Sequence, residues 1–136
     1  HRAEGFGLTI AEAMLAKKPV LTTAYSGNLD FCDYFNCFMV DFDLVQVGYS
    51  RLRYKPDDWW ASPKHESAVA GLKEIYFNKG LRDQKTRLAF ERVNRDLNVE
   101  AIGKLISRRL SAIGAKFTWQ AESKIINNKH EFKIED

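Results

Sequence analysis

The first long apolar stretch of the chain, residues 8–17, consists of strong helix formers without a breaker, and Pro19 follows it. That pattern predicts a helix that ends before the proline. Two short apolar runs come next, at residues 20–23 and 38–40, each bounded by turn residues or a charged residue. Such runs are typical of buried strands. A loop followed by helix, strand, loop and strand predicts a parallel α/β sheet.

Residues 43–63 interrupt this alternation. They contain glycine and proline together with Tyr49, Tyr54, Trp59 and Trp60. Aromatic side chains at this density seek burial, so we expect an ordered excursion from the sheet. We expect the two tryptophans to pack this excursion onto the domain. The alternative is that they stack on a sugar or a base.

Apolar positions at helical spacing predict three helices in the second half of the chain. The first is expected to have Ser62 as its cap and Pro63 at its first position, and to end at Gly80. The second follows that glycine. The third is expected to have Asn98 as its cap and to end at Gly114.

The composition is that of an ordinary globular domain, with 45% hydrophobic and 29% charged residues. A formal net charge of +3 is too small for the basic face of a nucleic-acid-binding protein, so no nucleic-acid partner is expected. Cys32 and Cys37 form no Cys-x-x-Cys pair and the histidines are scattered, which argues against a metal site and a disulfide framework. We expect packed, free thiols in a reducing compartment, the cytoplasm. No apolar run reaches the ~18 residues of a transmembrane helix.

Glu12 lies within the first predicted helix. At about 100° per residue, a helix that begins at Leu8 places Glu12 on the same face as the apolar Leu8 and Leu15. A carboxylate on a buried apolar face needs a hydrogen-bond partner, an ion pair or a ligand, because burying it alone is costly. The alternative is a position at the edge of that face with a structural partner.

Gly5 and Gly7 flank Phe6 immediately before this helix, and Glu4 precedes them. Glycines let the backbone approach a ligand closely, and the first N–H groups of a helix favour phosphate. Carboxylates instead accept hydrogen bonds from hydroxyls. By itself, Gly-x-Gly also fits an ordinary turn. The combination with two carboxylates indicates a ligand that carries both phosphates and sugar hydroxyls, such as a nucleotide sugar.

The segment Glu4-Gly5-Phe6-Gly7-Leu8-x-x-x-Glu12-Ala13-Met14 resembles the Glu-x7-Glu signature of the group 1, or family four, retaining glycosyltransferases. The resemblance continues through short segments along the first 65 residues: Lys18-Pro19-Val20, Thr23, Tyr25-Ser26-Gly27-Asn28-Leu29-Asp30-Phe31, Val40-Asp41, Val47-Gly48 and Trp60-Ala61-Ser62-Pro63. Relatives usually have an acidic residue in place of Ser62. The helices up to Gly114 match loosely, and the segment after it has no counterpart.

The resemblance implies a Rossmann-like parallel sheet with flanking helices, the C-terminal half of a GT-B fold, followed by a helical C-terminal segment. In this family that half holds the donor. Glu4 matches the first glutamate, which contacts the donor sugar near the reacting carbon and is called catalytic. Glu12 matches the second, which accepts hydrogen bonds from the ribose. The backbone between them would meet the diphosphate or the sugar, at Gly5, Phe6, Gly7 and Leu8.

Five further residues are expected near this donor pocket. His1 and Arg2 occupy positions that line the pocket in relatives; the alternative is that they are frayed terminal residues. Ser26, Gly27 and Asn28 form the next loop at the carboxyl edge of the sheet. That loop would line the cleft, or it would be a tight turn in which Asn28 caps a helix.

The reaction implied is transfer of a sugar from a nucleoside-diphosphate sugar to an acceptor hydroxyl, with retention of the anomeric configuration. The family uses no cofactor and no obligatory metal. The acceptor would be a glycan, a lipid-linked compound or another hydroxyl compound. Residues 79–111 hold nine Lys or Arg against four acidic residues. We expect an ordinary solvated helix face there, and the alternative is peripheral contact with the inner face of a membrane.

Because the motif begins so near the first residue, we expect the chain to be a fragment. Residues 1–114 would be a partial nucleotide-sugar-binding domain that lacks its N-terminal part, and residues 115–136 a helical or loose tail. The N-terminal domain of the same protein would be a partner, and the fragment alone is expected to be inactive. Two alternatives stay open: a non-catalytic binding or assembly module of the same fold, and another GT-B-fold enzyme such as a phosphorylase.

Overall fold

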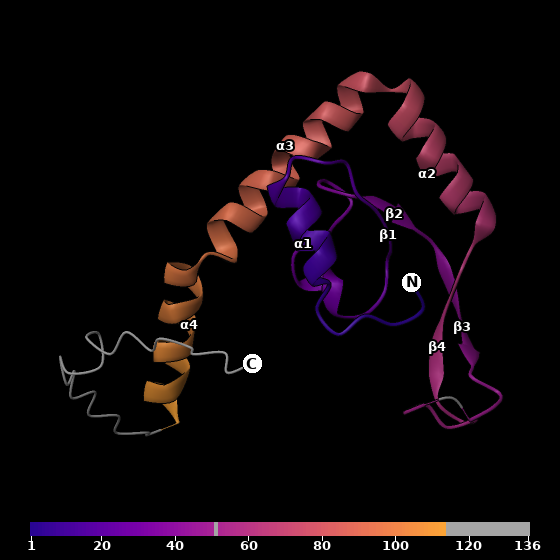
Figure 1. Cartoon of the computed structure of the whole chain (residues 1–136), viewed down its shortest axis with the longest axis horizontal. Coiled ribbons are helices and arrows are strands. Elements are labelled where there is room, and N and C mark those ends of the chain that lie inside the picture. The colour runs from indigo at the N-terminus through magenta and orange to yellow at the C-terminus, as the bar shows by residue number, and fades with distance from the viewer. Residues whose placement is uncertain (51, 114–136) are drawn as a thin grey trace, which may run out of the picture. The chain divides into compact units, whose positions relative to one another are not determined.

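A computed structural model of the chain describes residues 1–50 and 52–113 (Figure 1). Residues 1–102 form one compact unit, and the described residues 103–113 belong to a second. The described residues form a mixed α/β structure with a two-stranded parallel sheet, an antiparallel strand pair and four α-helices. The predicted end of the last helix at Gly114 and the predicted tail, residues 115–136, lie outside the described residues.

The parallel sheet and the helix before it confirm the pattern of the first forty residues. Helix α1 (Leu8–Leu15) precedes strand β1 (Leu21–Thr23), which pairs in parallel with β2 (Phe38–Val40). Gly7 precedes α1 with a φ of 94°, in the left-handed region that glycine adopts without strain. α1 ends two residues earlier than predicted, and Lys17 then turns the chain with a φ of 53°.

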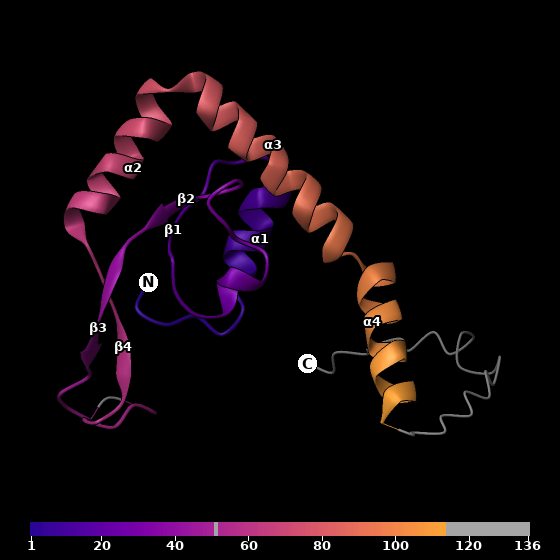
Figure 2. The ribbon, with the colours of Figure 1, turned by 180° about the vertical axis from the view of Figure 1, so that it is seen from behind.

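The buried core of the first unit joins α1 and the sheet to a distant helix, α3 (Lys79–Asp96). α1 lies beside α3 in both views (Figures 1 and 2). Ala89 and Val93 of α3 pack in one cluster with two residues of α1 and four residues from the segments that flank the strands, which are Ala11, Met14, Val20, Phe31, Cys32 and Cys37. This core fixes α1, and therefore the segment that precedes it, against the sheet.

The predicted excursion is a hairpin of β3 (Phe42–Gln46) and β4 (Trp59–Pro63). Trp60 is buried, and the rings of Tyr49 and Tyr54 lie 6.4 Å and 5.6 Å from its own. That part of the packing prediction is confirmed. It is wrong for Trp59, which is 56% exposed, because neighbouring residues of a strand point to opposite faces.

Two predicted helix boundaries are wrong. Ser62 and Pro63 do not begin a helix: they end β4, where they pair with Asp43 and Phe42. Proline is tolerated at a strand end, and α2 (His65–Phe77) begins two residues later.

Gly80 does not separate the next two helices, because it lies in the first turn of α3. The boundary is at Asn78, whose Oδ1 accepts a hydrogen bond from the N–H of Leu81 at 3.1 Å and so caps α3. Asn98 caps α4 (Val99–Ala112) as predicted, with its Oδ1 2.8 Å from the N of Ala101.

Candidate functional site

The predicted site residues of two loops lie against each other. The carbonyl of Glu4 accepts hydrogen bonds from the N–H of Gly27, at 3.0 Å, and from the hydroxyl of Ser26, at 2.7 Å. The Ser26 hydroxyl in turn lies 3.3 Å from the N of Glu4. The main chain of the segment before α1 is therefore bound to the loop that follows β1 by one backbone hydrogen bond and by the Ser26 hydroxyl.

Gly27 allows this contact because it has no side chain. A β-carbon at position 27 would lie 2.0 Å from the carbonyl oxygen of Gly5 and 2.6 Å from its carbon. No other residue fits without movement of one of the two backbones. The sequence predicted either a cleft-lining role or a simple turn for Gly27. In the structure, Gly27 is the point at which the two loops approach each other most closely.

Glu4 directs its carboxylate toward the start of α1. Its Oε1 accepts a hydrogen bond from the N–H of Gly7 at 3.1 Å, and the side chain is half-buried. The other oxygen, Oε2, accepts no hydrogen bond from the residues that the structure describes. The loop thus orients a carboxylate at a helix N-terminus and leaves one of its oxygens open to a ligand.

Glu12 does not lie on the buried face of α1, and that prediction is wrong. The helix packs through Ala11 and Met14, and its other side carries Glu12 between Leu8 and Leu15, which are 67% and 46% exposed. A helix with apolar residues on both sides does not reveal from its own pattern which side is covered. The exposed carboxylate requires no partner, so burial gives no argument for a ligand at Glu12.

Asn28 neither lines a cleft nor caps a helix with its side chain. It is fully buried, and its Nδ2 donates to the carbonyl of Thr23 at 3.1 Å and lies 3.4 Å from the hydroxyl of Thr22. Its Oδ1 is buried without a hydrogen-bond partner. His1 meets the same strand, with its Nε2 3.1 Å from the Thr22 hydroxyl. The two buried threonines at the end of β1 are therefore part of the support for this site.

Two other predicted residues pack elsewhere. The guanidinium of Arg2 lies over the ring of Trp60, 4.8 Å from its centroid, and so faces the hairpin. The ring of Phe6 packs at a tilt against the buried Phe31, with 5.2 Å between ring centroids. These contacts hold the ends of the Glu4 segment, and the polar groups nearest Glu4 remain Ser26, Gly7 and Gly27.

The two cysteines are core residues in contact with each other. Both are free, with 2% of Cys32 and none of Cys37 exposed. The hydrogen bond from Cys37, together with one from Asn28, lowers the pKa of Cys32 although burial opposes this. The same thiol pair and burial raise the pKa of Cys37. The structure thus places both thiols in the packing role expected from the sequence.

We expect neither thiol to react with a disulfide reagent such as dithionitrobenzoate in the folded chain, since buried structural cysteines are inert. Both should react once guanidinium chloride unfolds the protein. Colour release before and after denaturation measures this. Rapid stoichiometric reaction of the folded chain would contradict the burial described here.

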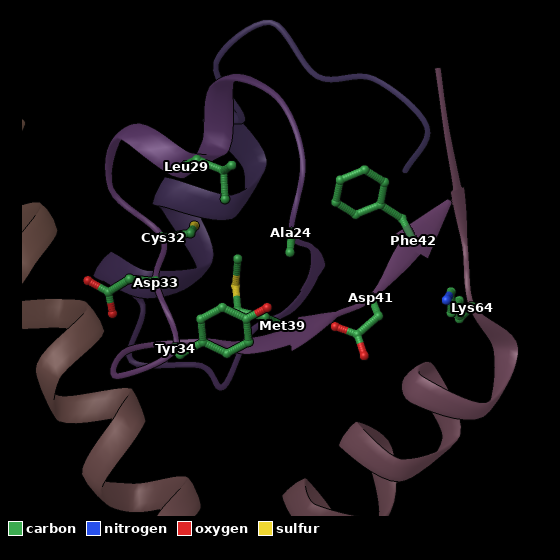
Figure 3. Close-up of a pocket in the computed structure, with 9 residues that line it drawn as sticks. All are labelled: Ala24, Leu29, Cys32, Asp33, Tyr34, Met39, Asp41, Phe42 and Lys64. Carbon is green, nitrogen blue, oxygen red and sulfur yellow. The ribbon is translucent and has the colours of Figure 1, made fainter. Parts of the chain in front are cut away.

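A hollow beside the carboxyl ends of β1 and β2 contains residues that the sequence did not single out (Figure 3). Asp41 follows β2 directly, and Ala24 follows β1. A polar residue at the carboxyl end of a parallel strand is a recognised signal for a ligand site. Asp41 could have been found in this way, whereas Tyr34 and Lys64 reach the hollow only through the tertiary fold.

Within the part of the chain that the structure describes, no group of three or more His, Cys, Asp or Glu side chains is arranged to hold a metal ion. None of the described helices has the length and apolar character needed to cross a membrane. No family model matches the chain, and neither a curated protein nor a solved structure matches it. The fold and the site thus define a mixed α/β protein in which a braced loop presents Glu4 at the start of a helix.

Proposed function

We propose that this chain is the donor-binding part of a retaining glycosyltransferase with a GT-B fold. The observation that carries the proposal is the placement of Glu4 within the Glu-x7-Glu motif. Its carboxylate is held at the N-terminus of α1 by the Gly7 N–H, and its backbone is braced by Ser26 and Gly27. We further propose that the chain forms part of a Rossmann-like domain, with which the small parallel sheet is compatible.

The chemistry of this loop suits a nucleoside-diphosphate sugar. The first N–H groups of a helix and its dipole attract a diphosphate. The open oxygen of Glu4 can accept hydrogen bonds from sugar hydroxyls near the reacting carbon. Glu12 lies farther along α1 and is exposed, so its carboxylate is accessible to the ribose hydroxyls.

The proposed reaction transfers the sugar to an acceptor hydroxyl with retention and without an obligatory metal. The helix N-terminus and basic side chains would stabilise the leaving diphosphate. A second domain would supply the acceptor site, so the 136-residue chain alone is expected to transfer no sugar. The proposed setting is the cytoplasm, at the inner face of a membrane where the acceptor is lipid-linked.

Donor binding tests the proposal in the complete transferase, meaning a protein that joins this chain to a second GT-B domain. Glu12→Ala is expected to raise the Kd of the preferred donor about tenfold, because a charged hydrogen-bond acceptor for the ribose is lost. A thermal-shift panel of UDP, GDP and ADP sugars identifies that donor, and titration then gives the Kd.

Glu66→Ala is the matched control, since Glu66 is an exposed glutamate in the first turn of another helix, α2. It should leave the Kd unchanged. Stabilisation by none of the three donor classes, or equal affinities for the wild-type protein and the Glu12→Ala variant, would count against the donor site. The non-catalytic module would then be the better account.

A further inference from the structure

The hollow beside β2 has the size and the lining of a small-molecule site. Its volume is about 530 Å³, within the roughly 300–1,000 Å³ typical of ligand pockets. Its lining includes two aromatic residues, Tyr34 and Phe42, and two aliphatic or thioether side chains, Leu29 and Met39. In Figure 3 Tyr34 and Met39 overlap in the view, and Asp41 is drawn to the right of both side chains.

The walls of the hollow are held by backbone contacts. The carbonyl of Tyr34 accepts a hydrogen bond from the amine of Lys85 in α3. The backbone N–H of Asp41 donates to the hydroxyl of Ser67 at 3.0 Å, and the carbonyl of Asp41 accepts from the N–H of Lys64 at 2.7 Å. Tyr34 is nevertheless 63% exposed as a residue, so its side chain is accessible to a ligand.

The charges around the hollow disfavour an anion. Asp41 and Asp33 both line it, although the Asp33 carboxylate points away from the other side chains (Figure 3). The one basic residue of the lining, Lys64, already pairs with Asp43 at 3.1 Å. Among the described residues that line the hollow, a phosphate would meet the Asp41 carboxylate and a lysine that is already ion-paired.

A neutral sugar matches the aromatic, apolar and carboxylate groups that line the hollow. One face of a pyranose ring consists of C–H groups and packs on an aromatic ring, while its hydroxyls donate hydrogen bonds. Tyr34 and Phe42 supply the rings, and the Asp41 carboxylate accepts from two hydroxyls at once.

We propose that this hollow binds a neutral sugar unit of a glycan, with Tyr34 as the stacking platform and Asp41 as the hydroxyl acceptor. The site shares no residue with the proposed donor site. It therefore gives the protein a second carbohydrate contact, through which a glycan is held beside the carboxyl edge of the sheet. Its existence does not depend on whether the protein transfers sugar.

Saturation-transfer NMR on the 136-residue chain tests this, with the methyl glycosides of glucose, galactose and mannose as probes. At least one is expected to bind with a Kd of the order of 1 mM and to receive saturation at its ring protons. Tyr34→Ala and Asp41→Ala are each expected to weaken that binding roughly fivefold. Both residues are exposed, so neither change should disturb folding, and circular dichroism confirms this.

Three controls separate this site from others. Tyr76→Ala removes another exposed aromatic residue, in α2, and should leave the signal unchanged. Glu4→Gln and an excess of uridine diphosphate should also leave it unchanged, because they concern the donor site. Absence of saturation for all three glycosides, retention of binding in both the Tyr34 and Asp41 variants, or displacement by uridine diphosphate would each overturn the proposal.

Discussion

Replacing Gly27 with alanine is expected to lower the free energy of unfolding by roughly 1–3 kcal/mol, the usual cost of overpacking. The added β-carbon would stand 2.0 Å from the carbonyl oxygen of Gly5. That oxygen belongs to the backbone, so no rotamer change relieves the clash. One of the two loops has to move, and the hydrogen bonds that join them at the Glu4 carbonyl are strained or lost.

Urea unfolding followed by circular dichroism measures this effect. Gly5→Ala is the matched control, because a β-carbon at position 5 would have no atom within 4 Å. It should change the free energy of unfolding by less than about 0.5 kcal/mol, as is usual for surface substitutions. Equal stability of the two variants would show that the loops are not held as closely as described.

The same bracing explains why the site could be predicted in part. The sequence indicated the loop before α1 because its glycines and carboxylates are neighbours along the chain. It indicated the Ser26–Asn28 loop because turn residues follow a strand. The contact between the two loops depends on the position of α1 relative to β1. No pattern of neighbouring residues in the sequence predicts that position.

The secondary structure was also predictable where it depends on local sequence and not where it depends on distant pairing. α1, β1 and β2 were predicted because each has a local signal, such as helix formers or β-branched residues. Pro63 was assigned to a helix since proline suits both a helix start and a strand end. Only the pairing of β4 with β3, across residues far apart in the sequence, decides between them.

Glu12 shows where pattern reasoning fails on burial. α1 has apolar residues around most of its circumference, and contact with α3 and the sheet covers only the side of Ala11 and Met14. The hollow at Tyr34 and Asp41 was missed for a related reason. Its lining comes from η1 (Gly27–Asp30), the loop after it and both sheets, so it forms only when these segments meet.

If the chain belongs to a transferase as we propose, replacing Glu4 with glutamine is expected to lower kcat of that complete enzyme roughly 100-fold, the scale seen when one preorganised electrostatic contact to a transition state is removed. The substitution is nearly isosteric. In the wild-type chain the N of Gly7 lies 3.1 Å from Glu4 Oε1. The side-chain oxygen of glutamine can accept the same hydrogen bond, so the loop should retain its shape. What is lost is the negative charge that the proposed function places next to the transferred sugar.

Two measurements separate this chemical role from a structural one. The free energy of unfolding should change by less than about 0.5 kcal/mol in Glu4→Gln, whereas Glu4→Ala also removes the bond to Gly7 and should cost about 1 kcal/mol. Sugar transfer followed by product formation then reports kcat. If Glu4→Gln keeps full activity while the fold is intact, Glu4 serves only to cap α1, and the catalytic carboxylate has to be sought elsewhere. If stability and activity fall together in Glu4→Gln, the neutral oxygen of glutamine does not preserve the loop. The charge of Glu4 then serves to hold the loop and not to act on the substrate.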